Sequence, residues 1–437
     1  MNELVIMNRK QNIGDTITIQ EKVISFLIVL WPILNIYGIR GDSIGFGDCI
    51  IIPYCLYLFF VHIRKYRYIE FSYFLFFSLC MLISVFSYLL CDYSIQRQTL
   101  LSLVKDVIYV FVFSLVAPQY INMKYLFKVY KVIVIILSVL VIVQVAAYYL
   151  FGYMKPFVFY SPIFTLKDVG GYRHYIVTWY NHIPIYGYKV SSIFSEPAKF
   201  AQYVAPCFFL SFFDEKKKNN NVFFEIFITI VVFLTHSANG VVYMSLGWFM
   251  WILLRKNNRN AILRNILLVF FFAVTIGFLF VGNSNIWFIN RFREIGDSGI
   301  NSGNMRVLRG WKVFGQLNII QKIVGVGLDN YSQYISNHHI VTGYDGGYIG
   351  YMSGMSEIFV SGGILCGVLF VLLCVKYLRY HNDVVTSLVG LMLVILFASA
   401  ILNGPSFGLL IAIIESCIQV KKRRQGEYIE TYRGIKK

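Results

Sequence analysis

Long apolar stretches recur along the whole chain, and they constrain its fold more than any other feature. A membrane-spanning helix needs about 20 predominantly apolar residues. Twelve stretches of the 437-residue chain approach that length: 23–38, 44–62, 70–91, 99–117, 129–151, 198–213, 222–235, 238–254, 265–283, 357–375, 384–402 and 404–420. Only 14% of the residues are charged, whereas soluble domains carry about 25%. The sequence therefore predicts an all-α polytopic membrane protein with about 12 transmembrane helices, and it excludes a water-soluble enzyme.

The positions of Lys and Arg predict which connections face the cytoplasm. Cytoplasmic loops are enriched in basic residues, and here these residues collect in alternate connections, so that both termini are predicted to be cytoplasmic. The predicted order is a cytoplasmic N-terminus (1–22), helices 1–5 (23–151), a first large outer loop (152–197), helices 6–9 (198–283), a second large outer loop (284–356), helices 10–12 (357–420) and a basic cytoplasmic tail (421–437). Because the net charge of +17 is divided among short segments, it indicates contact with anionic membrane lipid and no nucleic acid.

Metal and nucleotide motifs are absent from the sequence. We find no HExxH, His-x-His or Asp-x-Asp for a metal, and no GxxxxGK[ST] or GxGxxG for a nucleotide. The eight cysteines lie in or at the ends of apolar stretches and form no CxxC pair, which favours neither a disulfide framework nor a zinc site. Chemistry on the outer face would therefore use no cofactor, and its substrate would have to arrive already activated.

A sugar linked to a lipid diphosphate is an activated substrate of that kind. Its departing pyrophosphate gathers negative charge, and the planar fork of arginine pairs well with phosphate oxygens. The candidate pyrophosphate-binding residues are the arginines of the outer loops: Arg173, Arg291, Arg293, Arg306 and Arg309. The acceptor hydroxyl needs a general base, for which the candidates are His338, His339 and Glu196. The simpler interpretations are solvated loop side chains and, for Glu196 before Pro197, the start of a helix.

Several segments in and around the two outer loops resemble the motifs of one family. Ser192–Ala201 reads SIFSEPAKFA and is similar to "G/S-x-F-x-EP-x-x-x-A", and Thr235–Gly240 resembles a "T-x-S-x-x-G" turn. Arg306–Trp311 is followed by GVGLDNY at Gly325–Tyr331, and Asn337–His339 is followed by Glu357 and by GGILCG at Gly362–Gly367. In this order and spacing, the segments resemble the bacterial O-antigen and capsule polymerases (Wzy-type) and the related O-antigen ligases.

The resemblance implies a fold, a reaction and partners. The fold would be a GT-C-like glycosyltransferase architecture in the bacterial inner membrane, with the two large loops and the active side in the periplasm. The reaction would join undecaprenyl-diphosphate-linked oligosaccharide repeats by metal-independent inverting glycosyl transfer, in O-antigen or capsular polysaccharide biosynthesis. The partners would be these lipid-linked substrates, membrane lipid and a chain-length regulator membrane protein. Two alternatives stay open at this point: an O-antigen ligase that uses the same donor, and a flippase for lipid-linked oligosaccharides.

Several charged residues lie within predicted spans, among them Lys105, Asp106, Glu225 and Glu415. A charge at the centre of a spanning helix costs roughly 2.5–3.5 kcal/mol on insertion scales, so such groups face a partner or a cavity. The sequence favours structural pairing of these groups over a channel for lipid phosphate.

Overall fold

The computed structural model consists mainly of helices, grouped in two compact units. It describes residues 17–39, 44–61, 71–90, 97–152, 157–158, 164–167, 189–212, 222–254, 302–341, 351–399 and 402–435. The first unit is formed by 1–67, 116–247 and 419–437, and the second by 68–115 and 248–418. Each unit therefore combines segments that are far apart in the sequence.

Helices occupy the predicted spans. The span 265–283 lies outside the described residues, and each of the others coincides with a helix: α2 (Ile19–Leu34), α3 (Phe46–Val61), α4 (Ser72–Leu90), α5 (Arg97–Val110) with its continuation to Tyr120, α7 (Met123–Phe151), α9 (Pro197–Phe212), α10 (Phe223–Leu234), α11 (Ala238–Leu254), α18 (Gly354–Leu378), α19 (Asp383–Ala398) and α20 (Pro405–Ile435). Within the described part, 4 helical runs are long and apolar enough to cross a membrane: 72–89, 99–120, 123–151 and 354–378. Several other helices are apolar but shorter. The helical class is confirmed, and twelve spans stay a prediction.

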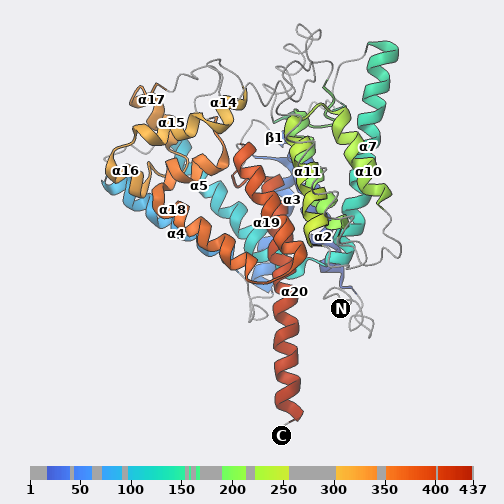
Figure 1. The fold of residues 1–437 in the computed structure, drawn as a ribbon. Coiled ribbons are helices and arrows are strands. Elements are labelled where there is room, and N and C mark those ends of the chain that lie inside the picture. The colour runs from blue at the N-terminus through green and yellow to red at the C-terminus, as the bar shows by residue number, and fades with distance from the viewer. Residues whose placement is uncertain are drawn as a thin grey trace. The chain divides into compact units, whose positions relative to one another are not determined.

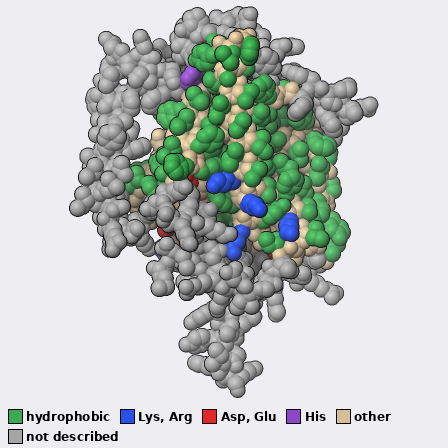
Figure 2. Space-filling view, turned by 90° about the vertical axis from the view of Figure 1, so that its right-hand side faces the viewer, with side chains coloured by type: hydrophobic (Ala, Val, Ile, Leu, Met, Phe, Trp, Pro, Cys, Tyr) green, Lys and Arg blue, Asp and Glu red, His purple; other side chains and the backbone are tan. Residues whose placement is uncertain are grey.

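The outward faces of the long helices are apolar. Leu82, Phe86 and Leu89 of α4 are each more than half exposed, and Figure 2 shows an extended hydrophobic face of the molecule. Such a surface is unusual for a monomer in water but is favourable against lipid tails. Together with the helix lengths, these faces indicate a membrane protein.

In the first unit, α9 forms the buried centre. Its side chains are buried on every side except at Ala198 and Lys199, as expected for a helix that is apolar all round. The Tyr203 hydroxyl donates to the carbonyl of Val29 on α2 over 3.0 Å, and the Tyr130 hydroxyl of α7 donates to the carbonyl of Tyr203. These two bonds fix α9 to both α2 and α7.

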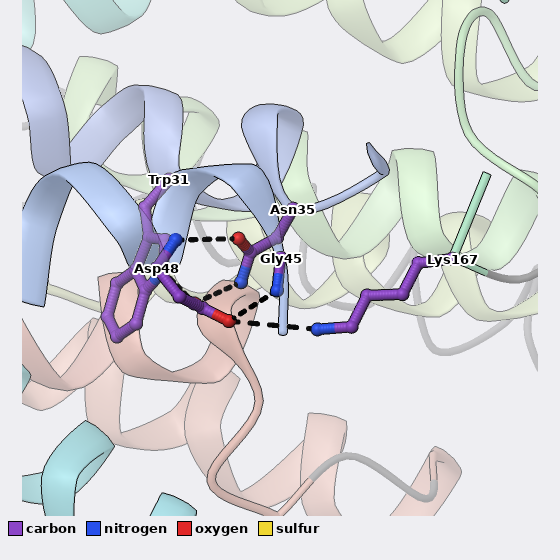
Figure 3. A network of polar contacts seen from close by, with 5 residues as sticks. All are labelled: Trp31, Asn35, Gly45, Asp48 and Lys167. Atoms are coloured by element: carbon purple, nitrogen blue, oxygen red, sulfur yellow. Dashed lines mark hydrogen bonds and ion pairs between the residues drawn. The ribbon is translucent and has the colours of Figure 1, made fainter. Parts of the chain in front are cut away.

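A buried carboxylate fastens the small sheet of the first unit, which the sequence does not predict. β1 (Tyr37–Ile39) pairs antiparallel with β2 (Phe164–Leu166), and β2 lies in the predicted first outer loop. Asp48 Oδ1 accepts from Trp31 Nε1 at 2.8 Å and from Asn35 Nδ2 at 2.6 Å, while Lys167, directly after β2, lies 3.7 Å from Oδ2 (Figure 3). A buried charge is tolerated when it is paired and hydrogen-bonded in this way. The network holds β2 against the α2–α3 connection.

In the second unit, α18 is the helix around which the others pack. It contacts α4 and α19 and also the short helices α15 (Arg309–Gln316), α16 (Ile319–Val324) and α17 (Tyr331–Asn337). With α14 (Ser302–Val307), these short helices lie at one end of α4 and α18 (Figure 1). Their shared core consists of apolar side chains from the short helices, the loop after α16 and the start of α18: Val313, Leu317, Val326, Tyr334, Ile335, Met352 and Val360.

A break in α18 receives the glycine-rich loop that follows α16. Gly363 has a φ of 65° and a ψ of −166°, which interrupts the helix. The Val326 N–H donates to the Val360 carbonyl at 2.9 Å, and the Gly327 N–H donates to the Ser361 carbonyl at 2.8 Å. A Cβ on Gly325, whose φ is +78°, would lie 2.2 Å from the Ser361 carbonyl oxygen. The close approach of the two backbones therefore requires glycine at this position.

We predict that Gly325→Ala destabilises the second unit. A side chain at this positive φ, pressed against a backbone carbonyl, should cost about 2–4 kcal/mol and lower the melting temperature of the purified protein in detergent. Gly315→Ala on α15 is the matched control, because an added Cβ there meets nothing within 4 Å. Equal melting temperatures for the two variants would contradict the close approach.

Candidate functional site

The arginine-bearing helices α14 and α15 are anchored on the first turn of α18. The carbonyl of Arg306 accepts from the N–H of Ser353, the N-cap of α18, at 2.8 Å. A Cβ on Gly310 would lie 2.1 Å from Ser356 Oγ, so α15 lies close against α18 at this position. The α14–α15 junction is therefore held by the start of α18.

Arg306 and Arg309 differ in how far they reach the surface. Arg306 is half-buried; its Nε donates to the Tyr351 hydroxyl, and its guanidinium lies 5.4 Å from the centroid of the Tyr351 ring. Arg309 is only 2% exposed, which excludes the interpretation of this residue as a solvated loop arginine. Both side chains are held in place, and Arg306 is the more accessible of the two.

The two candidate histidines lie just past the end of α17. His338 and His339 are both exposed, and the His338 ring lies against Tyr334 with 4.3 Å between centroids. The Tyr334 hydroxyl in turn donates to Gln321 Oε1 at 2.9 Å. The imidazole of His338 is thus positioned by a buried tyrosine while it stays exposed at the surface.

Glu196 lies in the first unit, directly before α9. Its carbonyl accepts from the N–H groups of Lys199 and Phe200 at 3.1 and 3.3 Å, so it opens the helix with Pro197 in the first position, as the simpler interpretation predicts. The loop before it is fixed to α7, because Gln144 exchanges two 2.8 Å hydrogen bonds with the backbone of Ser192. The Glu196 side chain is half-buried, and a role as base stays a prediction.

The structure brings together part of the predicted set. Arg306, Arg309, His338 and His339 all belong to the second unit, on helices that share one small core. Glu196 belongs to the first unit. The other three candidate arginines, Arg173, Arg291 and Arg293, lie outside the described residues.

Two of the carboxylates within the predicted spans, Asp106 and Glu415, have polar partners, as structural pairing predicts. Asp106 Oδ2 accepts from Asn403 Nδ2 at 2.9 Å, and the Tyr73 hydroxyl donates to Asn403 Oδ1 at 2.9 Å. Glu415 Oε1 accepts from the N–H of Tyr73 at 2.9 Å and from the Tyr377 hydroxyl at 2.6 Å. These bonds connect α4 and α5 to the last helices of the second unit.

Asp329 of the GVGLDNY segment is a further candidate site residue, outside the set that the sequence predicts. It interacts electrostatically with Lys105 and Asp106 of α5, with Tyr88 of α4 and with Glu357 of α18. It also has a left-handed φ of 56°, a conformation that costs free energy in a non-glycine residue and is frequent at functional sites. The only sequence signal is an acidic residue directly after a glycine-rich turn, since its neighbours come from distant segments.

Asp329 titrates closer to neutral pH than an ordinary aspartate. Its Oδ2 is buried and has no hydrogen-bond partner within the described part of the chain. Burial raises the pKa of Asp329 to about 6, and the nearby Lys105 ammonium opposes that rise. The group can therefore hold or release a proton near neutral pH. Over the same described ranges, no three His, Cys, Asp or Glu side chains are arranged to hold a metal ion.

A scan of the chain against protein-family models finds no match, and a search of curated proteins finds none. The resemblance to polymerases therefore depends on the motif segments themselves.

We predict that Asp329→Asn stabilises the protein at neutral pH and not at acidic pH. Below about pH 4 the aspartate is protonated in both folded and unfolded chains. As the pH rises to about 6, the unfolded chain ionises first, so wild-type stability falls. The Asp329→Asn variant has no carboxyl group to ionise here, so it does not lose this free energy of unfolding, which amounts to roughly 1–3 kcal/mol.

Melting temperatures of both proteins between pH 4 and 8 measure this difference. The gap should open with rising pH and level off above pH 7. Because backbone strain does not depend on pH, a gap of constant size would mean that the Asp329 carboxyl titrates normally.

Proposed function

We propose that the protein is a polysaccharide polymerase of the bacterial inner membrane. It joins undecaprenyl-diphosphate-linked oligosaccharide repeats on the periplasmic face. The growing chain is the donor, and a hydroxyl of the incoming repeat attacks its anomeric carbon with inversion. Both termini are cytoplasmic in this proposal, and a chain-length regulator membrane protein is the expected partner.

One observation supports the proposal above the others: the polymerase-like segments between Arg306 and Gly367 pack on one another in the second unit, while Ser192–Ala201 and Thr235–Gly240 belong to the first unit. The loop at Gly325–Leu328 is hydrogen-bonded to α18 beside the Gly362–Gly367 motif. Arg306 is bonded through its carbonyl to the same helix, and Tyr331 hydrogen-bonds the carboxyl group of Glu357. Segments in the 306–367 region that matched only by chance would have no reason to be hydrogen-bonded to one another.

The proposed chemistry assigns the pyrophosphate to arginines. Arg306 and Arg309 would stabilise the charge that develops on the leaving group, since fixed guanidinium groups act strongly where little water is present. Arg173, Arg291 and Arg293 are further proposed contacts. No metal or nucleotide takes part in this reaction, because the donor is already activated.

The acceptor hydroxyl is proposed to lose its proton to His338 or His339. Both imidazoles are exposed, and histidine is the side chain that most often serves as a general base in enzymes. Glu196, which lies at the start of α9, is the alternative base.

A flippase is the second candidate, because polar groups also line the interior of the second unit. Asp106, Asn403 and Tyr73 form a hydrogen-bonded row within the helices, and such rows mark transport pathways in many membrane proteins. A ligase, which transfers the same donor to another acceptor, would use the same arginines.

We predict that Arg306→Ala abolishes long polymer in cells while single repeats still reach the surface. Loss of one charge-stabilising donor typically lowers the rate 10²–10³-fold. Arg306→Lys should restore it only in part, because a point charge lacks the bidentate fork. The measurement is the distribution of chain lengths on a gel, together with surface labelling of repeats.

Arg379→Ala is the matched control. Arg379 caps the opposite end of α18 and is exposed, so its loss should leave the distribution unchanged. A full ladder of chain lengths from Arg306→Ala would exclude the pyrophosphate role. Repeats trapped on the cytoplasmic leaflet would identify the protein as the flippase.

A further inference from the structure

One face of α7 is exposed along the whole length of the helix. Residues on one face of a helix recur every three or four positions, and this stripe contains Lys124, Lys128, Lys131, Ile135, Val139, Ile142, Ala146 and Tyr149. All are exposed except Lys131, which is half-buried. The opposite face is buried in the first unit through Leu126, Tyr130, Val134, Leu137 and Val141. The stripe is therefore the outward face of the helix.

The composition of this stripe changes abruptly along the helix. Its first three positions are all lysines, the middle is entirely apolar, and the far end carries a tyrosine. At 1.5 Å per residue, Lys131 and Tyr149 are about 27 Å apart along the axis. That span is close to the roughly 30 Å hydrocarbon core of a bilayer, and tyrosines typically lie at its interface. The apolar part of the stripe therefore fits lipid tails better than a protein partner.

The lysines form a compact basic cluster at one end of the lipid-facing surface. Figure 2 shows basic side chains gathered together on a largely hydrophobic face. Lys131 Nζ lies 4.6 Å from the ring centroid of Phe224 on α10, so the cluster extends to that helix. Glu225, the next residue of α10, is fully buried and does not place a carboxylate on the surface. The cluster is thus positively charged beside apolar side chains.

We propose that Lys124, Lys128 and Lys131 bind the phosphate headgroup of an anionic phospholipid whose acyl chains lie along Ile135, Val139 and Ile142. The ammonium groups complement the phosphate, and the apolar stripe complements the tails. Each lysine near an anionic membrane surface contributes about 1 kcal/mol, or about fivefold in affinity. The site is independent of the proposed polymerase activity, since it lies on the surface of the first unit.

Native mass spectrometry of the full-length protein tests the site directly. The purified protein is mixed with equal amounts of phosphatidylglycerol and phosphatidylcholine that carry the same acyl chains. The wild type should retain phosphatidylglycerol in preference. Lys124→Gln/Lys128→Gln should lower that preference roughly thirtyfold, and Lys124→Arg/Lys128→Arg should keep it. Both side chains are exposed, so neither change disturbs the packing of α7.

Lys312→Gln/Lys322→Gln is the control. It removes the same number of positive charges, but from the short helices α15 and α16 and not from α7. It should retain phosphatidylglycerol as the wild type does. Equal retention of the two lipids by the wild type would overturn the proposal. So would unchanged retention by the α7 glutamine variant, or an equal loss in the arginine variant or in the control.

Discussion

The second unit depends on one interaction, the hydrogen bonds between the loop at Gly325–Gly327 and the opened turn of α18. A helix that breaks near a bilayer exposes carbonyl groups, and these must find donors within the protein. Here the donors are the N–H groups of Val326 and Gly327, bonded to Val360 and Ser361. Two further bonds to α4 hold the other side of the loop: the Ser87 hydroxyl donates to the Gly325 carbonyl, and the Leu328 N–H donates to Ser84 Oγ. This clamp fixes where α17 starts and hence where His338 lies.

The clamp also explains why a charged residue is found so close to apolar helices. Asp329 follows it directly and is held among Lys105, Asp106 and Glu357 by the backbone on either side. In the proposed polymerase, Asp329 could hold or release a proton within the unit that also carries Arg306 and His338. Hydrogen bonds on both sides of Asp329 stabilise its left-handed φ. The Asn330 side chain donates to the Val326 carbonyl, and the Tyr88 hydroxyl donates to the Leu328 carbonyl.

The sequence predicts elements well where hydrophobicity alone decides, and poorly where distant segments meet. α18 and α7 follow from runs of apolar residues that any chain must place in a helix in lipid. The observed helices are longer than the predicted spans, by three residues at each end of α18 and by six at the start of α7. The β1–β2 pair was not predicted, because three-residue strands gain their stability from Asp48 and Lys167, which are far apart in sequence. The burial of Arg309 also depends on residues that are distant in sequence. Its neighbour Gly310 packs against Met352 and Ser356, which are more than 40 residues away, so the sequence alone could not predict this burial.

The proposed polymerase transfers glycosyl groups between lipid-diphosphate-linked repeats without metal or nucleotide. The most direct measurement supplies the purified protein in lipid with such repeats, isolated from cells that lack the protein, in the presence of EDTA and without nucleoside triphosphate. We expect a ladder of lipid-linked products that differ by one repeat each. No product longer than one repeat, or products only after Mg²⁺ or Mn²⁺ is restored, would contradict it.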